Sequence, residues 1–522
     1  MSSNELEKSE KNLSPTHHDD LPIAASTDAI QEKEASDLES GLFNPSIETG
    51  STRAPSPERE DNIVDWNGPD DPENPMNWPR RKRVSHVALV SIITFISPLA
   101  SSMFAPAVPQ LMVEFHSTNT ELAAFVVSVY LIGFAAGPLV IAPLSELYGR
   151  LYVYHVNNIL FIIFTVACAL SPSLSALIGF RFLAGCAGSA PVTLGGGTIA
   201  DVIHPGHRGL AMALYILGML LGPNLGPVAG GFLAQAEGWR WTFWVLAIAS
   251  GIATLIILIF MRETYAPTIL ERKAQRLRKE TGNWKLRSKL HSGRTPRALF
   301  IQSIVRPAKM LFLSPIVFLL SMFMAIIYGY LYLLFTTFAI VFEDNYGFTS
   351  GTVGLAYLGI GMGSIAGVIV FACISDRLMK KLSAESGMKP EYRLPVMMYG
   401  SPLIPVGLFW YGWSIEAHAH WIVPIIGSSF VGFGLICVFM PIQTYMVDTF
   451  TLHAASALAA SSILRSLAGG LLPLAGQKMY AKLGLGWGNS LLAFIAMAML
   501  PVPWIFFRKG EYLRKRFEIK NL

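Results

Sequence analysis

Charged residues are scarce in this chain of 522 residues. Lys, Arg, Asp and Glu make up 14% of it and hydrophobic residues 52%, whereas an ordinary globular chain carries about 25% charged residues. Cysteine is rarer still: there are four, and all lie inside long apolar stretches. The composition excludes an ordinary soluble domain, and we expect neither a disulfide framework nor a metal site.

The motifs of two large function classes are also missing. The sequence has no GxxxxGK[ST] loop, which an ATP-driven pump needs to hold its nucleotide. It has neither the HExxH nor the GxSxG pattern of hydrolytic sites. We therefore expect a protein that is not an enzyme, carries no cofactor and binds no nucleic acid.

Long apolar runs are what the sequence has in excess. A helix needs about 20 apolar residues to cross the hydrocarbon core of a bilayer, and twelve stretches fit that length. They cover residues 84–113, 122–145, 151–180, 182–200, 209–236, 241–261, 310–342, 346–375, 394–415, 417–447, 449–477 and 483–507. The sequence predicts an all-α membrane protein of twelve transmembrane helices, with six-helix halves at residues 80–261 and 310–507 around a central loop at 262–309.

The charges are segregated along the chain. Residues 1–79 hold 18 acidic and 5 basic residues, a net charge of −13, and we expect them to form a disordered acidic tail. The central loop holds 13 basic and 3 acidic residues, and further basic clusters lie at 80–83 and in the tail at 508–522. Because basic loops stay on the cytoplasmic side, both termini and the central loop are expected there.

Two short loops repeat between the halves. APLSELYGR (142–150) follows the second span and ACISDRLMK (372–380) follows the eighth. Each places an acid, Glu146 or Asp376, after a serine and before basic residues. Such charges can pair across two cytoplasmic helix ends and hold the inward side shut, or they can simply set topology. We favour the gate.

Together these features resemble the major facilitator superfamily, whose transporters have twelve spans in two six-helix repeats. Its loop signature G-x-L-a-D-r-x-G-r-k is matched by Gly149 and Arg150, with Glu146 in place of the aspartate. The resemblance implies a cytoplasmic gate that also draws on the end of span 4 and on the second loop. Its residues would be Glu146, Gly149, Arg150, Asp201, Asp376, Arg377 and Lys381.

Longer segments are similar to the fungal twelve-span drug:proton antiporters, among them VDWNGPDDPENPMNWP (64–79) and GWRWTFW (238–244). The fifth span reads GMLLGPNLGPVAGG (218–231) and resembles the antiporter motif G-x8-G-x3-G-P-x2-G-G, with Ala213 replacing the first glycine. Glycines four apart share one helix face, which lets a neighbouring helix approach closely. We expect a packing seam that also bends or moves during transport, with packing alone as the alternative. The motif residues are Gly218, Gly222, Gly226, Pro227, Gly230 and Gly231.

Charges inside the spans are the candidates for energy coupling, because they are costly there. Arg181 matches the span-4 arginine that the resemblance implicates in proton transfer, and we favour coupling over a structural role. For Arg465, in span 11, coupling and a structural role stay open. His155 in span 3 is expected to be a buried imidazole, with proton shuttling as the alternative.

The substrate path is expected at the interface of the halves, near the membrane midplane. Aromatic side chains with a few polar groups suit an amphipathic organic compound. The candidate lining residues are Asn224, Phe323, Tyr328, Tyr332, Phe335, Phe439 and Gln443. No Asp or Glu lies in the middle of any predicted span, which disfavours a polycationic substrate.

The sequence thus predicts a proton-coupled efflux transporter for an amphipathic neutral or weakly acidic organic compound. Its expected partners are that small molecule, protons and the lipid bilayer, and it is expected to be monomeric. A polyamine:proton exporter is the alternative substrate class, and a non-transporting ligand receptor is the alternative of another class. The plasma membrane is the expected location, with the vacuolar membrane as alternative.

Overall fold

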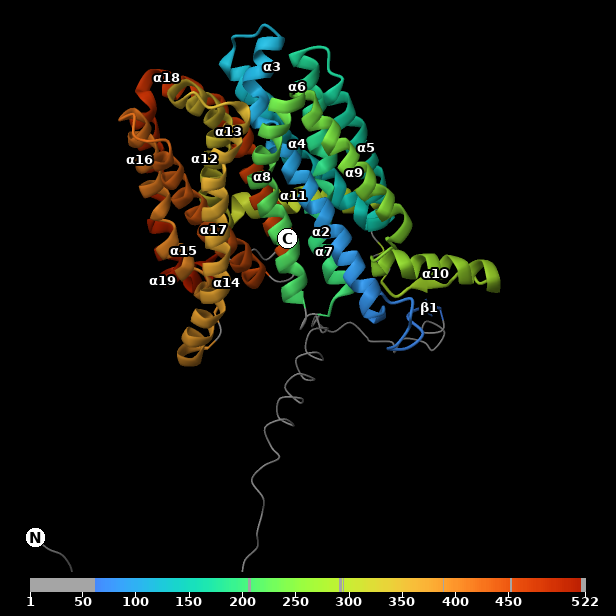
Figure 1. Cartoon of the computed structure of the whole chain (residues 1–522). Coiled ribbons are helices and arrows are strands. Elements are labelled where there is room, and N and C mark those ends of the chain that lie inside the picture. Colours follow the sequence, from blue (N-terminus) through green and yellow to red (C-terminus); the bar gives the residue numbers. More distant parts are fainter. Residues whose placement is uncertain are drawn as a thin grey trace, which may run out of the picture. The chain divides into compact units, whose positions relative to one another are not determined.

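The computed structural model describes residues 62–204, 208–290, 293, 295–387, 389–450 and 453–517. Helices dominate this part of the chain, as Figure 1 shows. Residues 1–61 of the expected acidic tail lie outside the described residues. Within the described residues, ten helices are long and apolar enough to cross a membrane by length and composition, which confirms a helical multi-pass membrane protein.

The N-terminal half consists of helices that run from blue to green in Figure 1. Its first span combines α2 (Arg80–Ser102), η4 (Ala105–Ala107) and α3 (Val108–Glu114), and its fourth combines α6 (Leu174–Gly188) and α7 (Ala190–Val202). The others are single helices. They are α4 (Thr120–Tyr148), α5 (Arg150–Ala169), α8 (Arg208–Glu237) and α9 (Arg240–Phe260).

The C-terminal half runs from yellow to red. It contains α12 (Pro315–Tyr346), α13 (Ser350–Ala356), α14 (Leu358–Ser386), η6 (Pro390–Arg393), α15 (Pro395–Gly400), α16 (Leu403–Glu416), α17 (Ile422–Thr449), α18 (Ala454–Met499) and α19 (Pro501–Arg516). Two features reconcile ten long helices with twelve predicted spans. Residues 454–516 form one of the ten stretches, but their 63 residues are about twice what one crossing needs. The non-helical Gly484 bends this stretch, so it provides two spans. The ninth span is divided between α15 and α16, and each piece is too short to be counted.

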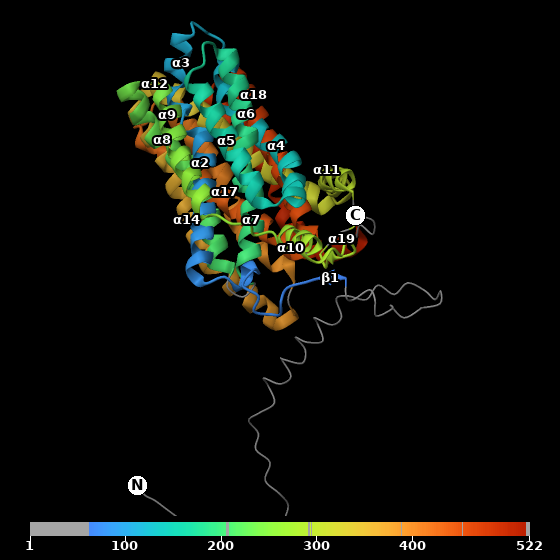
Figure 2. The ribbon, with the colours of Figure 1, turned by 90° about the vertical axis from the view of Figure 1, so that its right-hand side faces the viewer.

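We name the two ends of the helix bundle after elements that lie there. At the α3 end, Figure 1 shows α3 near α13 and the start of α6; at the α10 end it shows α10 (Ala266–Thr281) with β1 (Ile63–Val64). Figure 2 shows the same two ends from the side.

Residues 62–78 form an ordered segment, which we call the strap, so the tail boundary expected at residue 79 differs from the structure. β1 pairs in parallel with β2 (Arg287–Ser288), and η3 (Pro75–Asn77) contacts α7. The strap holds α10 through a buried ammonium: Lys273 Nζ donates to Asp65 O and Asn67 Oδ1, both at 3.0 Å, and pairs with Asp71 at 3.3 Å. Composition alone favours disorder here, but this buried cation provides the acidic strap with a partner.

A further helix of the central loop, α11 (Pro296–Leu313), packs against both halves. It contacts α4 of the N-terminal half and α12 and α18 of the C-terminal half. The loop therefore contributes helices to the α10 end of the bundle rather than only connecting the halves.

Candidate functional site

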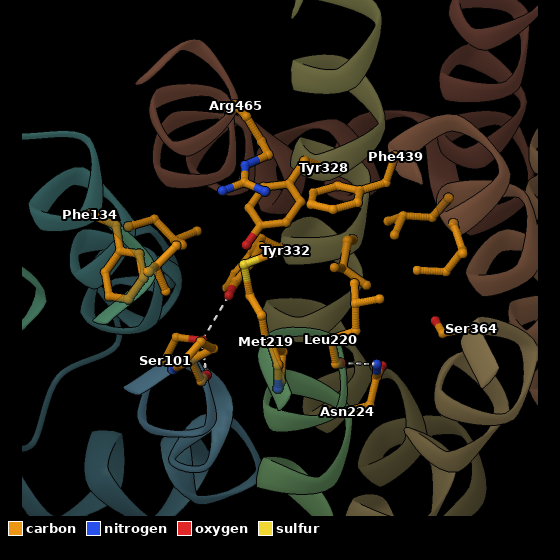
Figure 3. Close-up of a pocket in the computed structure, with 17 residues that line it drawn as sticks. Ser101, Phe134, Met219, Leu220, Asn224, Tyr328, Tyr332, Ser364, Phe439 and Arg465 are labelled. Atoms are coloured by element: carbon orange, nitrogen blue, oxygen red, sulfur yellow. Dashed lines mark hydrogen bonds between the residues drawn. The ribbon is translucent and has the colours of Figure 1, made fainter. Parts of the chain in front are cut away.

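A cavity lies where the two halves meet, and Figure 3 shows its lining. Side chains come from α2, α4, α7 and α8 of the N-terminal half and from α12, α14, α17 and α18 of the C-terminal half. They are Pro98, Ser101, Leu131, Phe134, Val192, Met219, Leu220, Pro223, Asn224, Tyr328, Leu331, Tyr332, Ser364, Leu435, Ile436, Phe439 and Arg465. Most are apolar or aromatic, and Arg465 is the one charged residue among these described lining residues.

Four of the candidate lining residues lie on this cavity: Asn224, Tyr328, Tyr332 and Phe439. Phe323 and Phe335 do not. Both are fully buried in the aromatic core of the C-terminal half, where Phe335 contacts Tyr357 with ring centroids 5.4 Å apart. Gln443 is half-buried and is not part of the lining. α12 is buried on most of its circumference, so its sequence carries no periodic sign of the face that meets the cavity.

One buried hydrogen bond crosses the cavity. Ser101 Oγ of α2 lies 2.7 Å from the hydroxyl of Tyr332 in α12, and Figure 3 shows it as a dashed line. Asn224 lies on the same wall as Ser101. Its Nδ2 donates to Leu220 O at 2.8 Å, while its buried Oδ1 has no hydrogen-bond partner among the described residues.

Arg465 enters the cavity from α18, and Figure 3 shows its guanidinium beside Tyr328 and Phe439. The guanidinium carbon lies 4.7 Å from the centre of the Tyr328 ring and 5.3 Å from that of Phe439. The side chain is 5% exposed. Its Nη2 donates to Ser462 Oγ at 3.3 Å, and its buried Nε has no hydrogen-bond partner in the described structure.

Arg181 has a different setting, inside the N-terminal half and behind the cavity lining, to which it does not itself belong. It is 1% exposed and donates from Nη2 to the carbonyl oxygens of Ser101 and Val127, at 3.1 and 3.3 Å. Three aromatic rings surround the guanidinium carbon at 5.4 to 5.6 Å. Carbonyl oxygens and ring faces are what a structural arginine requires, so proton coupling by Arg181 stays a prediction. His155 lies half-buried on α5, and its Nδ1 lacks a hydrogen-bond partner among the described residues.

The glycines of span 5 form the contact between α8 and α2. Cβ atoms added to Gly218, Gly222, Gly226 and Gly230 would crowd backbone oxygens spaced four residues apart on and directly after α2, those of Ser91, Phe95, Leu99 and Met103. Ser102 Oγ lies nearer still to the added Cβ of Gly226. Pro227 has no N–H, so the carbonyl of Pro223 loses its helical donor. Ser102 Oγ of α2 donates to that carbonyl at 2.8 Å. The predicted glycine seam is therefore a helix contact in the structure, while its movement during transport stays a prediction.

At the α3 end, polar groups connect the halves. Gln235 of α8 accepts from Thr349 Oγ1 at 3.0 Å and from the backbone N–H of Gly351 at 3.1 Å. Gln110 of α3 donates to Ser350 Oγ at 3.1 Å. Gly231, the last motif glycine, also packs here: a Cβ on it would lie 2.4 Å from the carbonyl oxygen of Ser350.

At the α10 end, each half has its own charge cluster. In the N-terminal half, Arg150 Nε pairs with Asp201 at 2.6 Å. Glu263, which follows α9, accepts from the backbone N–H groups of Arg150 and Leu151, and Gly149, at φ 93°, makes the turn before them. Glu146, the acid of the first loop, also has an interaction partner in the structure.

The cluster of the C-terminal half is centred on Arg393, which the sequence analysis missed. Its Nη1 pairs with Asp376 at 2.7 Å and its Nε with Asp448 at 3.1 Å. Arg377 and Lys381, expected at this gate, are exposed. The internal repeat could have predicted the role of Arg393, because the two halves place equivalent charges at equivalent positions. Arg150 directly precedes span 3 as Arg393 precedes span 9, and Asp201 ends span 4 as Asp448 ends span 10.

Known proteins are similar to this chain in sequence and architecture. The family model of the Major Facilitator Superfamily matches residues 90–473. The chain belongs to the Major Facilitator Superfamily. It is 56% identical over 485 residues, 93% of this chain and 95% of the other, to the MFS-type transporter penM of Penicillium rubens. It is also 56% identical to the efflux pump radE of Floropilus chiversii over 89% of this chain and 87% of that one.

Solved structures of this superfamily share the fold. The partially occluded inward-open form of the xylose transporter XylE from E. coli has a TM-score of 0.63 at 16% identity, covering 82% of this chain and 98% of that one. The relatives are named as transporters or efflux pumps, so this superfamily member is a multi-pass membrane transporter and not an enzyme.

Proposed function

We propose that this transporter exports an amphipathic neutral or weakly acidic organic compound, such as a drug, toxin or secondary metabolite, in exchange for protons. The cavity between the halves carries this proposal. Its apolar and aromatic walls suit an amphipathic molecule, and its described lining holds no carboxylate. The names of the relatives, among them an efflux pump, support export rather than uptake.

Alternating access provides the mechanism. The polar contacts around Gln235 and Gln110 close the α3 end. The clusters around Arg150 and Arg393 each stay within one half at the α10 end. Rocking of the halves then has to break the first set of contacts before substrate leaves at the α3 end. The positive-inside asymmetry of charge supports a cytoplasmic position for the α10 end and both termini. The proposed location is the plasma membrane, with the vacuolar membrane as the alternative.

Inverted membrane vesicles test export and coupling together. Accumulation of substrate in such vesicles should require an acidic vesicle interior, so that protons leave as substrate enters, and it should collapse when a protonophore is added. Accumulation that ignores the gradient overturns proton coupling, and binding without accumulation supports a ligand receptor instead. Arg181→Lys and Arg181→Gln then test coupling: both should bind substrate, and Gln should lose gradient-driven accumulation.

A polyamine exporter is the second candidate, because the antiporter-like sequence of span 5 favours export without setting the substrate class. A polycation needs carboxylates in its site, and the described cavity offers an arginine instead. Spermidine competing better than uncharged or acidic aromatic compounds for transport would favour this candidate.

A further inference from the structure

We infer that Arg465 is the counter-ion for an anionic group of the substrate, so that the transporter selects amphipathic organic acids over their uncharged analogues. The inference rests on the proposed export function, since that function makes the cavity the substrate site. It narrows the substrate to molecules that combine an apolar body with a carboxylate or a similarly acidic oxygen.

The first support is that Arg465 lacks an ionic partner. A guanidinium carries five N–H donors and stays charged at every physiological pH. In the described structure Arg465 donates one hydrogen bond, to Ser462 Oγ, and takes part in no ion pair. Burying a charge is costly unless it is paired, and Arg465 is 5% exposed. An anionic ligand would provide the missing partner.

The second support is the position of the group. Figure 3 shows the guanidinium directed into the cavity and not into the protein interior. Tyr328 and Phe439 flank it and fix its orientation through their ring faces. Aromatic surface beside a fixed cation is the combination that an aromatic acid requires: the rings pack on its apolar body while the guanidinium pairs with its oxygen atoms.

The third support is the contrast with Arg181. Both arginines are buried, but the guanidinium of Arg181 donates to two backbone carbonyls and lies among three rings. Arg181 is absent from the cavity lining, whereas Arg465 belongs to it. Both guanidinium groups leave Nε without a hydrogen-bond partner among the described residues. The contrast is that Arg181 is held by two backbone carbonyls outside the cavity lining, whereas Arg465 lies on the cavity wall, where a ligand can reach it.

Matched probes test the inference by equilibrium binding in detergent at pH 7.5, where a carboxylic acid is ionised. The pairs are 1-naphthaleneacetate with 2-(1-naphthyl)ethanol, and 1-pyrenebutyrate with 1-pyrenebutanol. We expect the wild-type protein to bind at least one carboxylate about tenfold more tightly than its alcohol. Arg465→Gln should abolish that preference, and Arg465→Lys should keep part of it. Arg272→Gln, which removes an exposed arginine on α10, is the matched control and should keep the full preference.

Two results would overturn the inference. One is a wild-type protein that does not prefer either carboxylate. The other is an Arg465→Gln variant that unfolds at the wild-type temperature and still prefers the carboxylate. The binding assay needs no gradient, so it separates the inference from the proposed function. The Arg465→Gln variant could lose the preference while wild-type vesicles accumulate substrate without a proton gradient. That combination would leave the inference standing and overturn proton-driven export.

Discussion

The glycine seam between α8 and α2 predicts a graded response to alanine substitution. The atom nearest to an added Cβ would lie at 3.1 Å for Gly218 and 2.7 Å for Gly222, a backbone oxygen of α2 in both cases. It would lie at 2.6 Å for Gly226, where it is Ser102 Oγ, and at 1.7 Å for Gly230. Real Cβ atoms essentially never approach another atom closer than 3.0 Å. The atom opposite Gly230 is the backbone oxygen of Met103, which cannot move aside unless α2 moves with it.

The magnitude follows from two opposing effects. Alanine gains about 1 kcal/mol over glycine in a helix interior, and overpacking costs about 1 to 3 kcal/mol, occasionally more. At Gly218 the two effects nearly cancel. At Gly230 the helices have to separate by more than about 1 Å, so overpacking dominates and we expect a net loss of about 2 kcal/mol or more.

Thermal unfolding of the purified variants in detergent measures this series. The unfolding temperature should fall least for Gly218→Ala, which should stay close to wild type, further for Gly222→Ala and Gly226→Ala, and most for Gly230→Ala. Gly251→Ala in α9 is the matched control, because nothing lies within 4 Å of its added Cβ. Equal unfolding temperatures for Gly230→Ala and Gly251→Ala would refute the argument that close approach at the seam stabilises the fold.

Three further predictions concern the two ends of the bundle. Arg393→Ala should reduce transport strongly, because it leaves Asp376 and Asp448 without their shared cation. Replacing the exposed Arg377 by alanine should not reduce transport, and equal losses in the two variants would favour Arg377 as a gate residue after all. In a cysteine-free background, Gln235→Cys with Thr349→Cys, joined by a short thiol cross-linker, should block transport until the link is cleaved; undiminished transport would show that the α3 end need not open. Hydrogen bonds from the backbone N–H groups of Asn67 and Glu73, together with Lys273, lower the pKa of Asp71 below its ordinary value of 3.8. Stability from this carboxylate is therefore present above pH 3.8 and lost as the pH falls through its lower folded-state pKa. The strap should resist limited proteolysis from pH 8 to pH 5 and be cut only in stronger acid, and release between pH 7 and pH 5 would contradict this.

Hydropathy and charge were sufficient to predict the spans, because burial in lipid acts on every residue of a crossing helix. The same information could not identify the cavity face of α12. Phe335 and Tyr332 lie three residues apart on a helix that is apolar all round, and only the packing of the second half assigns one to the core and the other to the cavity. The strap was missed for a different reason. Its acidic composition is typical of disorder, and Lys273, the buried partner that orders it, lies about 200 residues away in sequence. Arg393 was obscured because the second loop is longer than the first, which separates the arginine from the motif around Asp376.

The strap has a consequence for how the chain is made. Its strand β1 begins at Ile63 and pairs with Arg287, which is 224 positions later. At about 5 to 20 residues per second, a ribosome needs roughly 10 to 45 s to synthesise that interval. During this time the strap emerges and all six spans of the N-terminal half are inserted before Lys273 and β2 exist to receive it. A closed strap therefore marks a chain whose N-terminal half is complete, and the onset of its protease resistance during translation would time the completion of that half.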